Sequence, residues 1–423
     1  MATAPAADTR GATNPLFNAN KLKLGVFATN VSGGCAITLA DGRFETTWPN
    51  ARAVNTLADQ AGFEALVPVA RWKGFGGPSN FNGTCFETFT WAAGFAAQTE
   101  HAAVFATAHV PTIHPIVAAK QGTTIDHISG GRFALNVVCG WFQPELAMFG
   151  APVMEHDTAY EYAAEWLDVV RALWATAGEF DHAGRYFRIQ KGFHEPKPLQ
   201  RPFPPVMSAG SSEVGRRFAA RYADMAFTQA RPADFEGTRA QIAALRRLAR
   251  EEFGRELQVW TTAYVVCRPT EREAREYLHH YVHERGDWEA VENLTRIMGL
   301  QKRHLTAAAL EGLKAQFVAG WGGFPLVGTP EQIVDALLQA SRAGIDGVTL
   351  SWVRYEAELQ QWIAEVLPLL EQAGLRQPFA PGRADLPPRP PSRGGKGGKT
   401  DLSPWPPLPI REGGGDYPPA PSR

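Results

Sequence analysis

Two asparagines in this sequence stand where a side-chain amide could orient a small polar ligand. Asn136 lies within the apolar stretch Phe133–Val138, and Asn30 follows the apolar stretch Leu22–Ala28. An amide donates and accepts hydrogen bonds at once, and residues at the C-terminal ends of buried parallel strands face the ligand side. Without a ligand, Asn136 needs protein partners, and Asn30 can close an Asx-turn. Ligand contact and structural hydrogen bonding therefore both stay open.

A second candidate is an anion-binding turn. The strand expected over Val206–Ala209 runs through Gly210, Ser211 and Ser212 into a helix expected over Glu213–Tyr222. A small-residue turn that opens a helix presents unpaired backbone N–H groups at the positive end of the helix dipole, and adjacent hydroxyls add donors. This pattern suits a phosphate group. An ordinary serine cap is the alternative.

The histidines do not favour a metal site. They lack the HxH and HExxH spacings, and no acidic residue falls in register with them. His109 ends the strand expected over Ala103–His109 and is the candidate proton donor or substrate contact, although a structural hydrogen bond is the commoner role. The residues considered are His101, His109, His114 and His127.

Two arginines stand near predicted strand ends. Arg71 opens the glycine-rich stretch Arg71–Gly77, which lacks the GK[ST] of a Walker loop. Most arginines in such loops are solvated at the surface, which is the alternative to a role in ligand binding. Arg354 leaves the strand expected over Gly347–Ser351 and could pair with an anionic substrate, but a surface ion pair is an equal alternative.

Strands and helices alternate about eight times along the chain, which predicts a (βα)₈ TIM barrel of the α/β class. Insertions are expected after the second, fourth and seventh strands. The last of them, over Glu284–Gly323, carries glycines near its end and is a candidate lid. The expected domains are a flexible N-terminal arm at 1–20, the barrel at 21–376 and a disordered Pro/Gly-rich tail at 377–423.

Composition narrows the function classes. The 423 residues carry a net charge of -1 and are 44% hydrophobic, which suits a large core but not binding to nucleic acid or anionic lipid. No apolar run approaches the roughly 18 residues of a membrane span, and the N-terminus lacks the apolar centre of a signal peptide. The four scattered cysteines lack CxxC spacing. A cytoplasmic protein whose partners are small molecules or other proteins is expected.

Several segments together resemble the flavin-dependent monooxygenases of the bacterial luciferase-like family, in the branch of the dimethyl sulfone, alkanesulfonate and pyrimidine enzymes. The resemblance spans roughly Leu22 to Leu375. Its most specific segments are NVSGG at Asn30, TTIDHISGGRFALNVVCGW at Thr123–Trp141, PKPLQRP, AGSS and PLVGTPEQI.

The resemblance implies roles for particular residues. Those that would contact the flavin or its phosphate are Ala70, Arg71, Thr107, Asn136, Glu145, Tyr160, Ser211 and Ser212. The candidates on the catalytic and substrate side are Asn30, His109 and Arg354. No metal is implied.

By the same resemblance, the enzyme would bind FMNH2 from a separate NAD(P)H-dependent flavin reductase and use O2 to oxygenate a small substrate. An organosulfur compound with carbon-sulfur cleavage is the first expectation, and a homo-oligomer, dimer or tetramer, is expected. The alternatives are a deazaflavin- or FMN-dependent dehydrogenase or reductase on the same barrel, and an oxygenase of a nitrogen heterocycle. A non-catalytic flavin-binding protein and a metal-dependent barrel hydrolase are further alternatives.

Overall fold

Eight parallel strands close into a barrel in the computed structural model, which describes residues 8–210, 212–230, 234–299 and 306–380. The ring order is β9-β11-β1-β2-β3-β4-β7-β8, and a pairing of β8 with β9 closes it. This confirms the predicted (βα)₈ barrel. The barrel strands are β1 (Lys23–Phe27), β2 (Ala65–Val67), β3 (Ala103–His109), β4 (Phe133–Val138), β7 (Val206–Ser208), β8 (Met225–Phe227), β9 (Gln258–Cys267) and β11 (Gly347–Ser351).

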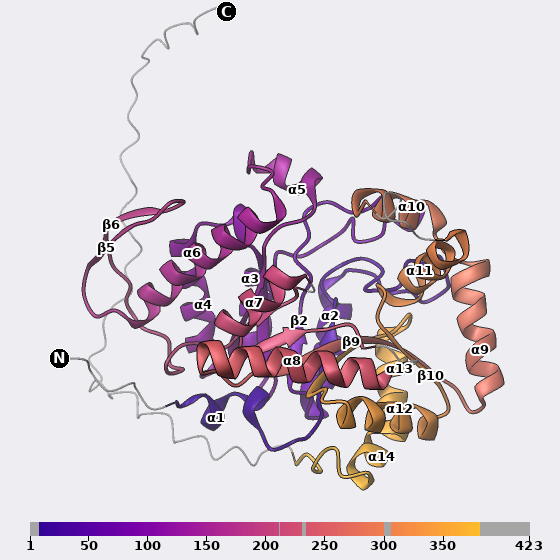
Figure 1. The fold of residues 1–423 in the computed structure, drawn as a ribbon. Coiled ribbons are helices and arrows are strands. Elements are labelled where there is room, and N and C mark those ends of the chain that lie inside the picture. Colours follow the sequence, from indigo (N-terminus) through magenta and orange to yellow (C-terminus); the bar gives the residue numbers. More distant parts are fainter. Residues whose placement is uncertain (1–7, 211, 231–233, 300–305, 381–423) are drawn as a thin grey trace, which may run out of the picture. The chain divides into compact units, whose positions relative to one another are not determined.

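Helices follow the strands and surround the barrel (Figure 1). Their ends match local signals: α4 stops at Gly130, whose φ of 68° is left-handed, and a Thr329–Gln332 capping box opens α12. The helices are α1 (Arg10–Thr13), α2 (Trp48–Gln60), α3 (Thr88–Ala96), α4 (Pro115–Ser129), α5 (Gln143–Met148), α6 (His156–Ala175), α7 (Glu213–Tyr222), α8 (Phe235–Phe253), α9 (Glu271–His279), α10 (Trp288–Ile297), α11 (Ala307–Gly320), α12 (Pro330–Arg342), α13 (Tyr355–Gln361) and α14 (Leu367–Gln372). No helix in the described ranges has the length and apolarity that a membrane crossing requires.

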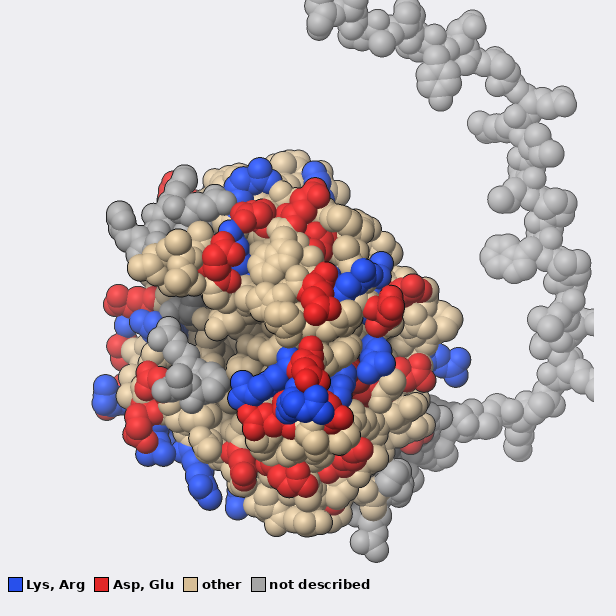
Figure 2. All heavy atoms as spheres, turned by 90° about the vertical axis from the view of Figure 1, so that its right-hand side faces the viewer, with Lys and Arg blue, Asp and Glu red and all other residues tan. Residues whose placement is uncertain are grey.

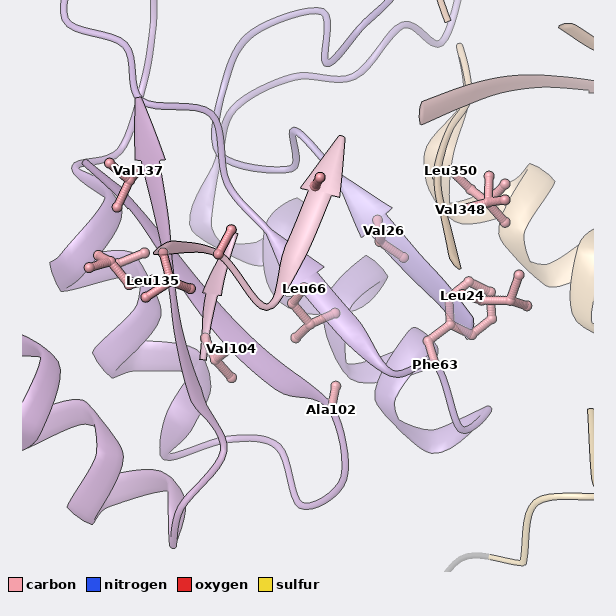
Figure 3. Close-up of a cluster of buried hydrophobic side chains, with 14 of the residues drawn as sticks. Leu24, Val26, Phe63, Leu66, Ala102, Val104, Leu135, Val137, Val348 and Leu350 are labelled. Atoms are coloured by element: carbon pink, nitrogen blue, oxygen red, sulfur yellow. The ribbon is translucent and has the colours of Figure 1, made fainter. Parts of the chain in front are cut away.

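Alternation along the strands separates two apolar cores. The outward side chains pack under the helices (Figure 3); they include Leu24, Val26, Leu66, Val104, Leu135, Val137, Val348 and Leu350. The inward set fills the barrel and includes Ala65, Val67, Ala103, Phe105, Ala134, Met207, Met225 and Trp260. Because side chains alternate with a period of two, Thr107, His109 and Asn136 belong to the inward set as well. They sit above Ala103, Phe105 and Ala134, toward the C-terminal ends of β3 and β4.

The N-terminal segment closes the opposite end of the barrel. Leu16 is fully buried with the inward core, Asn14 donates to Gln200 over 3.0 Å, and Gln258 donates to the Leu16 carbonyl over 2.7 Å. The flexible arm predicted over 1–20 is therefore wrong for residues 14–20. The short apolar segment Pro15-Leu16-Phe17 stands among small and polar residues, so the sequence pattern did not indicate that it is buried. Residues 1–7, and 381–423 of the predicted tail, lie outside the described residues.

The insertions predicted after the second, fourth and seventh strands are present, and α5, α10 and α11 lie on the upper side of Figure 1, opposite α1. A hairpin forms from β5 (Phe180–Ala183) and β6 (Arg188–Gly192). The short helix α5 follows β4, and a further strand, β10 (Phe324–Gly328), pairs with the C-terminal half of β9.

Candidate active site

The inward face of β3 and β4 carries a polar pair at the barrel mouth. Thr107 and Asn136 are register partners, and Asn136 Nδ2 donates to Thr107 Oγ1 over 3.2 Å. Thr107 Oγ1 donates in turn to the Pro68 carbonyl over 2.6 Å. Asn136 Oδ1 is buried and has no hydrogen-bond partner among the residues that the structure describes. A buried acceptor without a donor is costly, so this atom suits a ligand that brings an N–H group.

Next to this pair, three ionisable side chains from different elements meet. Glu145, on α5, is fully buried. Its Oε1 accepts from Arg71 Nη1 at 3.3 Å and from the backbone N–H groups of Trp72 and Lys73 at 2.6 and 3.1 Å. His109 Nδ1 lies 3.1 Å from Glu145 Oε2. Glu145 thus holds the loop after β2 and the end of β3 together.

The pKa values follow from burial and from this neighbourhood. Burial acts to raise the pKa of Glu145, but His109, Arg71 and the Trp72 N–H outweigh it, and the pKa lies below its usual range. Burial lowers the pKa of His109; Glu145 opposes that effect and Arg71 adds to it, and the net shift is downward. Near pH 7 the site therefore holds a carboxylate, a guanidinium and a neutral imidazole.

Aromatic rings cover the Arg71 guanidinium. Its central carbon lies 4.8 Å from the ring centre of Phe75, 5.2 Å from that of Phe142 and 5.5 Å from that of Trp141. Trp321, at the end of α11, packs against Phe75 with 5.5 Å between ring centres. Sequence reasoning missed these aromatic residues; their position beside glycines in strand-end loops was the available signal. They shield the ion pair from water.

The N-terminus of α7 forms a small-residue cradle. A side chain at Gly210 would place its Cβ 2.6 Å from Tyr160 Oη and 2.7 Å from Gly215 Cα. Ser212 caps the helix, its Oγ accepting from the Gly215 N–H over 3.1 Å, which leaves the hydroxyl hydrogen able to donate. Burial raises the pKa of Tyr160 to about 12, so the phenol stays a donor. Ser211 lies outside the described residues.

Asn30 forms structural hydrogen bonds, one of the two roles that the sequence left open. It is fully buried, and its Nδ2 donates to the carbonyls of Val69 and Phe86 over 2.8 and 3.1 Å. Its Oδ1 accepts from the Val69 N–H over 2.8 Å. These bonds occupy both donors and bind the loops after β1 and β2 together. Asn30 therefore braces the mouth and does not offer its amide to a substrate.

Arg354 lies outside this group of side chains. It comes 3.8 Å from Glu358, stacks on Tyr277 at 5.5 Å, and lines a separate surface pocket with Gly42 and Phe44. The structure shows the ion pair weighed as the alternative for Arg354, and its predicted role toward a substrate stays a prediction. Ala70 is buried directly before Arg71.

Figure 2 shows a hollow in the face of the molecule that forms the right-hand side of Figure 1. Uncharged residues line the visible part of the hollow, with acidic and basic residues scattered around it. No group of three or more His, Cys, Asp or Glu side chains suited to a metal ion occurs in the part of the chain that the structure describes. A closed TIM barrel with amide, imidazole and ion-paired groups at the C-terminal ends of its strands defines an enzyme active site of the barrel class.

Comparison with known proteins identifies the family. A family model described as luciferase-like monooxygenase matches residues 22–347. The FMNH(2)-dependent dimethylsulfone monooxygenase of Pseudomonas putida is 31% identical over 360 residues, which cover 83% of this chain and 96% of that protein. Pyrimidine monooxygenase RutA of Escherichia coli K12 is 30% identical over 354 residues, 83% of this chain and 92% of that one.

The crystal structure of long-chain alkane monooxygenase (LadA) has the same fold, with a TM-score of 0.75 at 22% identity over 87% of this chain and 95% of that one. The chain belongs to the luciferase-like monooxygenase family. It is an oxidoreductase of the flavin-dependent monooxygenase class.

Proposed function

We propose that this enzyme binds FMNH2 at the barrel mouth and uses O2 to oxygenate a small, uncharged organosulfur compound with cleavage of a carbon-sulfur bond. A separate NAD(P)H-dependent flavin reductase supplies the reduced flavin. The observation that carries the proposal is the unpartnered Asn136 Oδ1, because the flavin ring edge offers an N–H group to a buried acceptor. The 31% identity with a dimethylsulfone monooxygenase supports the substrate class.

The residues present fit a phosphorylated flavin. Gly210 and Gly215 leave room beside Tyr160 Oη, and the α7 N-terminus directs backbone N–H groups and the Ser212 hydroxyl to an anion. Asn136 and Thr107 lie on β4 and β3, and β4 is the neighbour of β7, which leads into this cradle. The ring would rest near Asn136 and the phosphate at α7.

Bound reduced flavin supplies the electrons that activate O2. The protein's part is to position the ring and to keep water out. Asn136 orients the ring edge, while the rings of Phe75, Phe142 and Trp141 cover the polar groups after β2 and β4. We assign Glu145 to holding Arg71 and His109 in place, because Arg71, Trp72, Lys73 and His109 surround its carboxylate.

A nitrogen heterocycle is the second candidate substrate. The neutral His109 imidazole can accept a hydrogen bond, which a ring N–H supplies and a dialkyl sulfone does not. The 30% identity with pyrimidine monooxygenase RutA is consistent with that class.

The test has two stages. Anaerobic titration with FMNH2 should show saturable binding that is at least tenfold tighter than binding of reduced riboflavin, because riboflavin lacks the phosphate. Turnover under ¹⁸O₂ with a flavin reductase and NAD(P)H should then place one labelled oxygen in the products of dimethyl sulfone. Uracil and methanesulfonate serve as competing substrates. Absence of FMNH2 binding, or no consumption of dimethyl sulfone that depends on both reduced flavin and O2, would contradict the proposal.

A further inference from the structure

The Glu145 carboxylate holds the loop after β2, and it also faces the imidazole of His109. Its Oε1 already receives three donors, whereas Oε2 lacks a standard hydrogen bond and faces His109 Nδ1 at 3.1 Å. A carboxylate can only accept, so the favoured partner is an Nδ1–H group. In a neutral imidazole the other nitrogen, Nε2, then carries the lone pair.

Nothing within the described residues uses that lone pair. His109 is the last residue of β3 and belongs to the inward set, so it stands at the mouth of the barrel. Its Nδ1 lies 3.1 Å from Glu145 Oε2, and no hydrogen bond within the described residues involves its Nε2. His109 Nε2 is therefore a hydrogen-bond acceptor at the barrel mouth, where Asn136 and Thr107 would hold the flavin ring.

We infer that Glu145 is a positioning residue that fixes the His109 tautomer, and that His109 Nε2 is the proton acceptor for the bound substrate. The inference rests on the proposed function and adds a residue role to it. Of the two roles predicted for His109, proton donor or substrate contact, it keeps the substrate contact and replaces the donor with an acceptor.

The step is a simple proton transfer. Nε2 forms a bond to a proton of the substrate, from an N–H or an O–H group such as the ring N–H of a nitrogen heterocycle, and the substrate keeps the electron pair of the broken bond. The imidazole becomes an imidazolium whose charge the Glu145 carboxylate offsets across 3.1 Å. The proton then passes from Nε2 to water when the product leaves.

Two charged groups face His109 and act in opposite directions. Glu145, from α5, favours the imidazolium, and Arg71, from the loop after β2, disfavours it. Burial also disfavours it, so the imidazole is neutral near pH 7 and able to accept a proton. Removing Glu145 should therefore lower the pKa of His109, and removing Arg71 should raise it. An ion pair with only a structural role would not shift the pH dependence of activity in these opposite directions.

The pH dependence of kcat/KM tests the inference. The wild-type value should fall on the acidic side as His109 gains a proton. Arg71→Met should move that midpoint to higher pH, and Glu145→Gln should move it to lower pH. His109→Gln should lose about a hundredfold or more in kcat/KM and show no such limb. Glu165→Gln is the matched control, because Glu165 on α6 pairs with His182 of the hairpin over the same 3.1 Å. The midpoint of the kcat/KM profile should not move in this variant.

A readout without turnover separates this inference from the proposed function. In protein labelled with ¹⁵N-histidine, NMR should show His109 as the Nδ1–H tautomer in the wild type and a loss of that preference in Glu145→Gln. An Nε2–H tautomer, or midpoints that move in the same direction in Glu145→Gln and Arg71→Met, would overturn the inference. Failure of FMNH2 to bind would overturn the proposed function instead.

Discussion

Asn30, after β1, and Asn136, on β4, are the same residue type, yet their surroundings differ. Three hydrogen bonds to Val69 and Phe86 occupy Asn30. Within the described ranges, the side chain of Asn136 makes one hydrogen bond, to Thr107, and its buried oxygen has no donor. The first amide stabilises the fold, and the second is kept for a ligand. Substituting each of them should separate stability from binding.

Asn136→Ala should weaken FMNH2 binding by roughly tenfold or more, since a hydrogen bond to a buried group is worth about 1–3 kcal/mol. The free energy of unfolding should change little, because the substitution removes a single hydrogen bond within the protein, the one to the Thr107 hydroxyl. Anaerobic flavin titration and urea denaturation measure the two quantities. Equal flavin affinity in the variant and the wild type would remove Asn136 from the site.

Asn30→Ala should show the reverse pattern. It leaves the Val69 N–H and two carbonyls without partners, so the free energy of unfolding should fall by about 2–4 kcal/mol. Urea denaturation measures the loss. Flavin affinity of the folded fraction should stay within about threefold of the wild-type value. A larger loss of affinity at unchanged stability would return Asn30 to a ligand-contacting role.

At the scale of elements, the turn from β7 into α7 combines a sequence signal with a steric requirement. The Ser212 cap was visible in the sequence, but the need for glycine at 210 comes from Tyr160 on α6, 50 residues earlier. A Cβ at position 210 would meet both Tyr160 Oη and Gly215. Three elements therefore form the cradle: α6, the turn after β7, and α7.

Gly210→Ala should displace Tyr160 or the start of α7 and so weaken binding of FMNH2 by at least tenfold. Binding of reduced riboflavin, which has no phosphate, should change by less than about threefold. Parallel titrations with both flavins measure the ratio. Ser212→Ala is the companion variant: it should lower FMNH2 affinity and also cost about 1 kcal/mol of stability as a lost cap. Equal losses for both flavins would contradict a phosphate site at α7.

At the scale of the whole molecule, a buried ion pair links the end of the barrel domain to its beginning. Arg376 Nη1 lies 2.6 Å from Glu64 Oε2, and their side chains are 1% and 0% exposed. Arg376 also donates to the carbonyls of Leu22 and Gly62 over 3.2 and 2.7 Å. The pair fastens the last described segment to the strands that begin the barrel.

Arg376→Ala should lower the free energy of unfolding by about 3–5 kcal/mol, because it strands the buried Glu64 carboxylate. Arg272→Ala is the matched control, since its pair with Glu276 is 73% and 59% exposed and exposed pairs contribute at most about 1 kcal/mol. Chemical denaturation compares the two variants. Similar small effects would mean that residue 376 does not hold the barrel closed.

Stability should also depend on pH through His194. Its ring is buried, Nε2 bonds Thr123 Oγ1 over 2.8 Å, and Nδ1 has no partner in the described part of the chain. Burial, with Lys120 and Lys197 nearby, lowers its pKa to about 4. The unfolded chain, with a pKa of about 6.5, therefore binds more protons between these two values, and stability falls as pH drops through that window.

The measurement is the difference in unfolding free energy between wild type and His194→Asn from pH 7 to pH 4. That difference should shrink as pH falls, because only the wild type loses the contribution of a neutral buried imidazole. Other titrating groups cancel in the subtraction. A difference that is constant with pH would show that His194 titrates normally in the folded protein.

The sequence by itself determined the elements. The strand with Asn136 and the cap at Ser212 could be predicted because hydrophobic period and capping residues act within a few positions of one another. From these local signals and the family resemblance came the barrel, the insertions and most of the residues at the mouth.

Only the tertiary structure decided how those residues are used. It placed His109 beside Glu145, satisfied Asn30, left Asn136 Oδ1 free, drew Arg354 to Glu358 and docked Leu16 under the barrel. Each outcome depends on a contact between segments far apart in the chain. Strand register and barrel closure set such contacts, and local sequence patterns do not record them.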